Sequence, residues 1–300
     1  MPRPPARRRL PDPDRPPSLP GAASSKGTAP FLLKRTTAIT TTTTSHTISS
    51  RQHPAIRELR RLRRRRERER SGRFLAEGED LLAAADAAGW KAVTRLHAAG
   101  SELPGRAVAP EVLAWASTLG SGTRAIGVYE QRWAAPVGPL CVYLHEVADP
   151  GNVGAIVRSA LAFGASSVAL GPGCADPYGP KAVRASMGAI FALPLAPAGA
   201  LEELPGRTLA LAAHSGEPLP GAQTSTPTTI LLGAERTGLP PEIEAASDEV
   251  RHIPISPASE SLNVAMAATV ALYELTAKSG HRMAATPAPD TPATPAGPIP

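Results

Sequence analysis

The chain has 300 residues, of which 42% are hydrophobic, and its 32 lysines and arginines exceed its 26 aspartates and glutamates by a formal net charge of +6. The length suggests one or two domains, each with a buried core. No apolar run approaches the roughly 18 uncharged residues of a membrane span, and prolines stand where a secretory signal would have its apolar segment. Because the only two cysteines are far apart, the sequence favours a cytoplasmic protein without a disulfide framework or a metal site.

Both ends of the chain lack the apolar periodicity of a folded domain. Residues 1–50 combine nine prolines before Phe31 with a threonine-rich run, and residues 279–300 carry six prolines among alanines and threonines. Such a composition cannot repay the entropy that is lost when a chain becomes ordered. We therefore expect two disordered tails, over residues 1–50 and 279–300.

Arginine is concentrated in residues 51–73, which hold eleven arginines and three glutamates, whereas residues 74–300 carry a net charge of −8. Ile56, Leu59 and Leu62 recur at helical spacing, so residues 51–72 are predicted to form an Arg-rich helical arm with a narrow apolar edge. This density of guanidinium groups predicts sequence-independent contact with nucleic-acid phosphates. The alternative is a solvated helix in which glutamates of the segment neutralise part of the charge. The arginines expected to bind nucleic acid are Arg60, Arg63, Arg64, Arg65 and Arg66.

The remaining sequence predicts two folded units. Residues 73–132 read as a small α/β domain, with strands at 73–76, 92–96 and 124–129 and helices at 79–88 and 112–116. In residues 139–278 apolar runs of strand length alternate with helical stretches, which is typical of an α/β fold with a mostly parallel sheet covered on both faces. Its expected strands are 140–144, 167–170, 190–195, 208–212, 229–232 and 250–255, and its expected helices are 153–163, 181–187, 241–246 and 262–278.

Three polar loops, two of which contain glycine, stand out in the second unit, at strand ends where ligands bind in parallel sheets. The glycine fingerprint of a dinucleotide-binding domain is missing from them, and the chain has no Walker phosphate loop. Asn152 in the first loop and Arg158 in the following helix are predicted to converge just outside the sheet. The three loops are Asp149–Gly154, Leu232–Leu239 and Ile253–Val264.

Taken in order, these loops resemble the three motifs of the SpoU, or TrmH-like, branch of the SPOUT RNA methyltransferases. The first unit is similar to the substrate-binding domain of that family, including Gly72–Gly78, and Asp176–Lys181 and Arg184–Gly188 resemble the segment between its first two motifs. The resemblance implies that the carboxy-terminal segment threads a trefoil knot that binds S-adenosyl-L-methionine. It also implies a homodimer that packs through the knotted domain and methylates a ribose 2'-hydroxyl of RNA.

Motif position assigns a role to ten residues. The resemblance implies that the catalytic residues are Asn152, Arg158, Glu235, Ser261 and Asn263, and that the cofactor-binding residues are Gly233, Gly238, Ile253, Ile255 and Leu262. Because an ordinary guanidinium stays protonated, we favour an Arg158 that grips a phosphate and stabilises negative charge on oxygen over one that removes the proton. The chain departs from the family pattern at Pro257, Ala234 and Arg236.

Several alternatives remain open at this stage. A separate substrate domain and a basic arm favour ribosomal RNA over transfer RNA as the partner. An RNA-binding or ribosome-assembly protein on the same fold, and a nucleotide-dependent α/β enzyme, are the competing classes. At the residue level, Asn152 and Ser261 also suit helix capping, and Tyr178 suits either stacking on a base or packing in the core.

Overall fold

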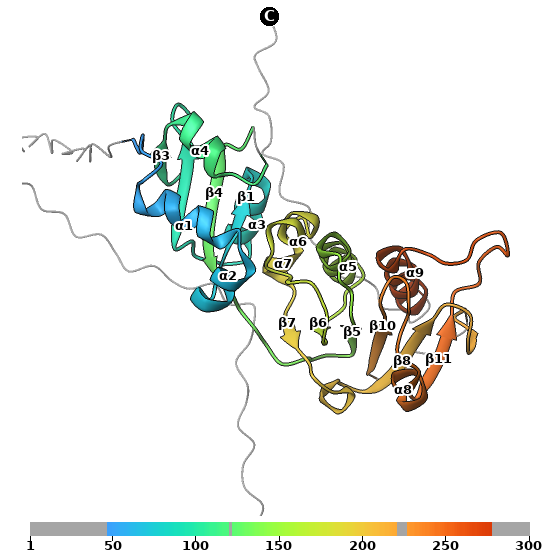
Figure 1. Ribbon diagram of the computed structural model, residues 1–300. Coiled ribbons are helices and arrows are strands. Elements are labelled where there is room, and N and C mark those ends of the chain that lie inside the picture. Colours follow the sequence, from blue (N-terminus) through green and yellow to red (C-terminus); the bar gives the residue numbers. More distant parts are fainter. Residues whose placement is uncertain (1–46, 120–121, 221–226, 278–300) are drawn as a thin grey trace, which may run out of the picture. The chain divides into compact units, whose positions relative to one another are not determined.

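The computed structural model describes residues 47–119, 122–220 and 227–277, and these form two α/β domains (Figure 1). We call residues 47–130 the amino-terminal domain and residues 140–277 the carboxy-terminal domain. Of the two expected tails, residues 1–46 of the first tail (1–50) and the whole of the second (279–300) lie outside the described residues. Among the described helices, none is long and apolar enough to cross a membrane.

The amino-terminal domain is built on a four-stranded sheet in the order β1-β4-β2-β3. Strand β4 is antiparallel to both β1 and β2, whereas β2 and β3 are parallel. The strands are β1 (Arg73–Glu77), β2 (Thr94–Ala98), β3 (Arg106–Val108) and β4 (Ala125–Glu130), and the helices are α1 (Pro54–Leu62), α2 (Arg65–Ser71), α3 (Glu79–Ala87) and α4 (Pro110–Ala116).

The Arg-rich segment belongs to this domain and is not a separate arm. Its apolar edge, Ile56, Leu59 and Leu62, is buried in one hydrophobic cluster with residues of β1, β4 and α4. Ile48 joins the same cluster at 3% exposure, and its backbone bridges to Val108 of β3. The amino-terminal domain thus begins before residue 50, which corrects the expected boundary of the first tail.

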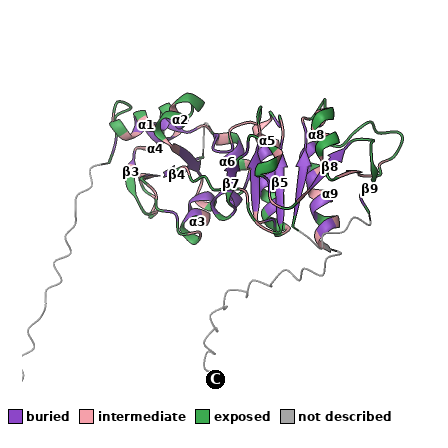
Figure 2. Ribbon diagram, turned by 90° about the horizontal axis from the view of Figure 1, so that it is seen from below, coloured by how far each residue is buried: buried purple, intermediate pink, exposed green. Residues whose placement is uncertain are grey.

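The carboxy-terminal domain contains a seven-stranded sheet in the order β7-β6-β5-β10-β8-β11-β9, and every pairing in it is parallel. Its central strands are buried, as Figure 2 shows. This confirms the predicted α/β class. The elements are β5 (Leu140–Leu144), α5 (Pro150–Ala162), β6 (Ser167–Leu170), α6 (Pro180–Ala185), α7 (Ala189–Ala192), β7 (Leu195–Pro197), a 3-10 turn (Leu201–Glu203), β8 (Arg207–Ala212), β9 (Glu217–Pro218), β10 (Thr228–Leu232), α8 (Pro241–Ala246), β11 (Glu249–His252) and α9 (Val264–Ala277).

One expected strand is wrong. Residues 190–195 were predicted as a strand, but Ala189–Ala192 form the short helix α7, and β7 begins only at Leu195. A short apolar run does not distinguish a buried strand from a buried helix. Here Gly188, at a φ of 91°, starts the helix and Pro194 follows its end, so the two breakers divide the run between a helix and a strand.

The two domains share a continuous apolar cluster. Phe74 of β1 lies 4.7 Å from the ring of Tyr178 and 5.9 Å from that of Phe191, both in the carboxy-terminal domain. A buried ion pair, at 2.7 Å, joins Arg68 of α2 to Asp176 in the loop after β6. The methyltransferase-like motif segment Asp176–Lys181 therefore connects the domains.

Candidate functional site

The first loop is fixed by a helix cap at the start of α5. The carboxylate of Asp149 accepts hydrogen bonds from the backbone amides of Gly151, at 2.6 Å, and Asn152, at 3.0 Å. Its other oxygen accepts from Lys181 Nζ at 2.7 Å. The hydrogen bond from Lys181 lowers the pKa of Asp149 below its ordinary value, and the two amides act in the same direction. The loop is thereby held with the side chain of Asn152 free to reach other partners.

Three residues from the three loops meet in a chain of hydrogen bonds. Asn152 Nδ2 donates to Glu235 Oε1 at 2.9 Å, and Asn263 Nδ2 donates to Asn152 Oδ1 at 3.1 Å. These residues are 83 and 111 positions apart in sequence, so only the fold brings them together. The predicted convergence of the three motifs holds for these side chains.

The second loop is a tight turn at the end of β10. Ala234 and Gly238 exchange two backbone hydrogen bonds, each of 3.0 Å, which close the turn under Glu235. A Cβ atom on Gly233 would lie 2.1 Å from the carbonyl carbon of Gly238, so no larger residue fits there without a shift. Gly238 has a φ of 69°, a conformation that glycine adopts without strain. Both predicted cofactor glycines thus have a structural reason to be glycine.

The third loop ends in a second helix cap. Asn263 Oδ1 accepts from the amides of Ala265, at 2.9 Å, and Met266, at 3.3 Å, at the start of α9. The same side chain therefore caps a helix through its oxygen and contacts Asn152 through its nitrogen. Ser261 and Leu262 are exposed just before it, whereas Ile253 and Ile255 are half-buried near the end of β11.

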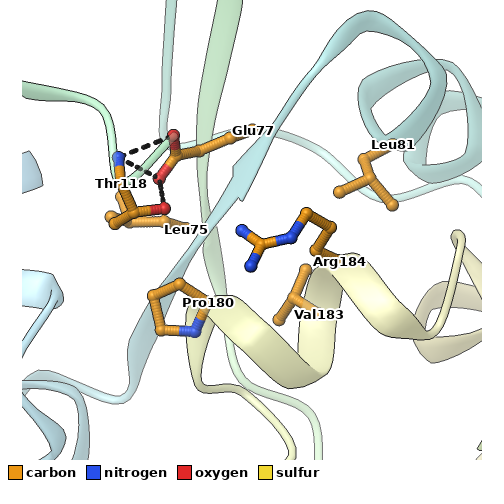
Figure 3. A pocket seen from close by; sticks show the side chains of 7 residues that line it. All are labelled: Leu75, Glu77, Leu81, Thr118, Pro180, Val183 and Arg184. Atoms are coloured by element: carbon orange, nitrogen blue, oxygen red, sulfur yellow. Dashed lines mark hydrogen bonds between the residues drawn. The ribbon is translucent and has the colours of Figure 1, made fainter. Parts of the chain in front are cut away.

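The meeting point of these loops borders an open cleft of about 780 Å³ at the carboxyl ends of β5 and β10. The second hollow in the described structure, drawn in Figure 3, lies between the domains and measures only about 10 Å³. There Arg184 extends toward the space beside Glu77, whose carboxylate is bonded to Thr118. That hollow has room for about one water molecule, so the cleft is the better candidate for a ligand site. The cleft is lined by Glu146, Ala148, Asp149, Asn152, Ala234, Glu235, Arg236 and Asn263.

Arg158 does not join this group. It lies on α5 six residues after Asn152, is exposed, and is not among the residues that line the cleft. Six residues correspond to about 9 Å along a helix, and to a rotation that turns the two side chains to different sides. The expected convergence of Asn152 and Arg158 therefore fails within a single chain.

Some residues that line the cleft were not predicted from the sequence, and the structure decides the role of one aromatic residue that the sequence left open. Glu146 lines the cleft with a φ of 55°, which is uncommon outside glycine, and nothing in its sequence neighbourhood signals this. Lys181 belongs to the motif-like segment Asp176–Lys181, but no functional role was predicted for it from the sequence. Tyr178 is 1% exposed, so it packs in the domain junction and does not offer a stacking surface to a base. No cluster of potential metal ligands occurs among the described residues.

The fold and the site define an α/β protein with a ligand cleft at the carboxyl edge of a parallel sheet, joined to a separate basic domain. The SpoU rRNA Methylase family matches residues 139–273, and the MRM3-like substrate binding domain matches residues 53–131. An uncharacterised tRNA/rRNA methyltransferase of Synechocystis is 33% identical over 255 residues, which are 76% of this chain and 92% of that protein. The chain therefore belongs to the SpoU family of RNA methyltransferases, as its motifs predict.

Two further relatives carry more specific descriptions. The AdoMet-bound rRNA methyltransferase from Sinorhizobium meliloti has a TM-score of 0.69 and 29% identity, and the match covers 76% of this chain and 96% of that structure. A 23S rRNA (uridine(2479)-2'-O)-methyltransferase of Streptomyces viridochromogenes is 34% identical over 152 residues. That match covers 45% of this chain and 51% of the relative, so the chain spans about half the length of the Streptomyces protein.

Proposed function

We propose that the protein uses S-adenosylmethionine to methylate a ribose 2'-hydroxyl of ribosomal RNA. The observation that carries this proposal is the hydrogen-bonded group of Asn152, Glu235 and Asn263, which joins the three motif loops at the cleft. The Sinorhizobium relative binds the same cofactor, and the Streptomyces relative methylates ribosomal RNA at the ribose. A separate basic domain also suits a large structured RNA.

The cleft suits the cofactor in size and charge. Its volume of about 780 Å³ lies within the range of roughly 300–1,000 Å³ that is typical of small-molecule sites. The carboxylates of Glu146, Asp149 and Glu235 outnumber the one guanidinium in the lining, that of Arg236, and Asp149 is already paired with Lys181; the remaining small excess of negative charge favours a ligand with a positive sulfonium. The cofactor supplies an electrophilic methyl group when it is bound. The residues proposed to hold it, largely through backbone atoms, do not line the cleft themselves but lie in the second and third loops that border it: Gly233, Gly238, Ile253, Ile255 and Leu262.

The polar side chains at the cleft are proposed to position the ribose. Methyl transfer requires the hydroxyl oxygen to be held in line with the methyl group, and correct orientation is a large part of catalysis. Asn152 and Asn263 have amide groups at the cleft that can bond a sugar hydroxyl, and Glu235 fixes the orientation of Asn152. Ser261 is exposed two residues before Asn263 and is available to the same substrate.

Arg158, which lies outside the cleft of its own chain, is proposed to grip a backbone phosphate of the bound RNA. A guanidinium binds phosphate through two parallel hydrogen bonds and stabilises negative charge that develops on a nearby oxygen. The exposed position of Arg158 leaves it accessible to RNA. Replacement by lysine keeps the charge but removes the bidentate geometry. Arg158→Lys is therefore expected to lower turnover, and wild-type turnover in this variant would contradict the proposed grip.

We also propose the trefoil knot that the family resemblance implies. Helix α9 follows β11 in the chain, yet it packs against α5, which follows β5 on the other side of β10 and β8 in the sheet. Ser159 of α5 and Thr269 of α9 are joined by a hydrogen bond of 2.7 Å. The connection from β11 to α9 must therefore return along the carboxyl edge, past the turn after β10. Threading at this point is rare in proteins in general.

A homodimer through the carboxy-terminal domain is proposed on the basis of an exposed apolar stripe. Met266, Val270 and Tyr273 recur on one face of α9 and are 64%, 42% and 59% exposed. Leu161 on the adjacent helix α5 is 39% exposed and lies one turn after Arg158. A second copy would cover this stripe and place Arg158 at the subunit boundary. Val270→Glu is then expected to yield monomers in sedimentation equilibrium.

Methyl transfer from labelled S-adenosylmethionine tests the proposed function. Purified protein is incubated with ribosomal RNA and transfer RNA, and nuclease digestion with mass spectrometry locates the methyl group. Labelled ribose in ribosomal RNA is the expected product. Glu235→Ala is expected to lower turnover by about a hundredfold, because it releases Asn152 from a defined orientation. Glu202→Ala, which removes an exposed carboxylate outside the cleft, is the matched control.

Other outcomes would select a different function. A methyl group on a base would contradict ribose methylation, and label in transfer RNA alone would select the second substrate class. Calorimetry separates the enzyme from an assembly protein, since an assembly protein would bind RNA without binding S-adenosylmethionine. Saturable binding of a dinucleotide in place of S-adenosylmethionine would favour a nucleotide-dependent enzyme.

A further inference from the structure

The arginines of residues 51–73 divide into engaged and unengaged groups. Arg65, Arg68, Arg70 and Arg73 form ion pairs, with Glu69, Asp176, Glu67 and Glu58 respectively. Arg51 and Arg60 lie over the ring of Trp115, at 5.2 Å and 4.2 Å from its centroid. The other five are exposed and have no ion-pair or aromatic partner among the described residues. We call these five the basic corner, and they are Arg57, Arg61, Arg63, Arg64 and Arg66.

The fold fixes where the basic corner lies. Helix α1 buries Ile56, Leu59 and Leu62, and the opposite side of the same helix carries Arg57 and Arg61. The remaining three arginines lie where α1 ends and α2 begins, because Arg63 caps α1 and Arg64 precedes α2 in an extended conformation. Figure 1 shows the two helices meeting at this junction.

Arg68 holds this junction rigid from the inside. Its side chain is 5% exposed and donates to the carbonyl oxygens of Leu62, at 2.9 Å, and Arg63, at 3.0 Å, while it pairs with Asp176. The last carbonyls of α1 therefore have a partner, and the α1–α2 bend is tied to the carboxy-terminal domain. The exposed guanidinium groups project from a backbone that is already ordered, so no backbone entropy is lost when a ligand binds.

We propose that the basic corner binds the phosphate backbone of the RNA substrate away from the nucleotide that is methylated. This inference rests on the proposed function for the identity of the partner. The three glutamates of the segment are already engaged in ion pairs, so the charge of these five arginines is not neutralised within the segment. Phosphate is the anion that guanidinium groups recognise best in repeated array, and such contacts are independent of sequence. All five lie within the part of the chain that matches a substrate-binding domain.

The proposed surface differs in part from the sequence expectation. Arg60 and Arg65 were expected to bind nucleic acid; Arg60 packs on Trp115 and donates to its carbonyl oxygen, and Arg65 pairs with Glu69. The basic corner leaves these two out and includes Arg57 and Arg61, which have no such partners among the described residues. Paired and unpaired arginines alternate within a few residues, so variants with the same change of charge can be compared directly.

The test compares two double variants of the full chain. Arg64→Gln with Arg66→Gln removes two members of the basic corner, whereas Arg65→Gln with Arg70→Gln removes two exposed, paired arginines. Affinity is measured against salt with an RNA stem-loop of arbitrary sequence, with the DNA hairpin of the same sequence alongside. Each lost phosphate contact flattens the slope of log affinity against log salt by about 0.9 for a duplex, so the first variant is expected to flatten it by about 2 and the second by less than about 1.

Kinetics and cofactor binding complete the test. The first variant is expected to lower kcat/KM for RNA while kcat at saturating RNA and the affinity for S-adenosylmethionine stay unchanged. Equal effects of the two variants would mean that bulk charge alone acts, and an unchanged slope in the first variant would mean that the corner does not touch phosphate. Loss of DNA affinity with an unchanged kcat/KM for RNA would also overturn the proposal. Failure of the wild-type chain to bind S-adenosylmethionine would refute the proposed function and leave the comparison of RNA slopes interpretable.

Discussion

Two buried tyrosines in the domain junction differ in whether their hydroxyl group is hydrogen-bonded. Burial raises the pKa of both Tyr129 and Tyr178 to about 12. The hydroxyl of Tyr178 donates to the carbonyl oxygen of Arg132 and accepts from its amide at 3.1 Å. The hydroxyl of Tyr129 finds no hydrogen-bond partner among the described residues. A buried polar group without a partner lowers stability, whereas a bonded one does not.

Removal of each hydroxyl is therefore expected to have opposite effects on the free energy of unfolding. Tyr129→Phe is expected to raise it by about 1 kcal/mol, and Tyr178→Phe to lower it by about 1–3 kcal/mol, because the second variant leaves the Arg132 amide and carbonyl unpaired. Urea unfolding of the two variants measures both changes. A Tyr129→Phe variant that is less stable than the wild type would show that this hydroxyl has a partner.

At the scale of single residues, sequence order gave the site but not its finer geometry. Asn152, Glu235 and Asn263 were assigned to one site because their loops resemble, in order, the three motifs of one methyltransferase family. Helix capping was left open for Asn152 and Ser261, and the structure gives the two caps to Asp149 and Asn263. A signal for Asp149 was present, because Pro150 after it occupies the first helical position that proline prefers.

Helices α5 and α6 are in close contact at Gly154. A Cβ atom there would lie 2.3 Å from the carbonyl oxygen of Ala182 and 2.7 Å from the Cβ of Ala185. These contacts hold α6 where Lys181 reaches Asp149, so the packing of two helices supports the loop that carries Asn152.

Gly154→Ala is expected to force the helices apart and to lower the free energy of unfolding by about 1–3 kcal/mol, the usual cost of overpacking. It should also weaken S-adenosylmethionine binding, because Lys181 is drawn away from Asp149. Chemical unfolding and calorimetric titration give the two readouts. Gly199→Ala is the control, since the nearest atom to its added Cβ is 3.9 Å away. Equal stability of the two variants would refute the close-packing argument.

At the scale of elements, the bounds were predicted correctly in some cases only. Helix α8 and strands β5 and β6 have the predicted bounds, whereas the longer helices α5 and α9 begin three residues before and two residues after their predicted starts. Strands β3 and β9 were not predicted, since three and two residues are too few to show alternation. The apolar edge of α1 was correct, but its partner in the amino-terminal domain was not predictable, because periodicity identifies a buried face without identifying what covers it.

At the scale of the whole molecule, the predicted start of the folded region was too late in the sequence. This matters when a shortened chain is designed. Ile48 is an isolated apolar residue beside a threonine-rich run, so no periodicity marks it. The structure places it next to β3, where its amide donates to the Ala107 carbonyl oxygen at 2.9 Å and its carbonyl oxygen accepts from the Ala109 amide at 2.8 Å. These contacts extend the sheet of the amino-terminal domain by one bridge. They also place the Ile48 side chain in the same apolar cluster as the buried face of α1.

A chain that starts at residue 47 is therefore expected to be more stable than one that starts at residue 51. Burial of an isoleucine side chain contributes about 1.5–3 kcal/mol, and its backbone hydrogen bonds would be lost as well. Urea unfolding of the two chains measures the difference, and Ile48→Ala in the full chain should reproduce most of it, whereas Ser49→Ala, at an exposed position, should not. Because α1 shares its apolar cluster with Ile48, the shorter chain is also expected to bind RNA more weakly through the basic corner. Equal stability of the two chains would show that the domain begins after residue 50.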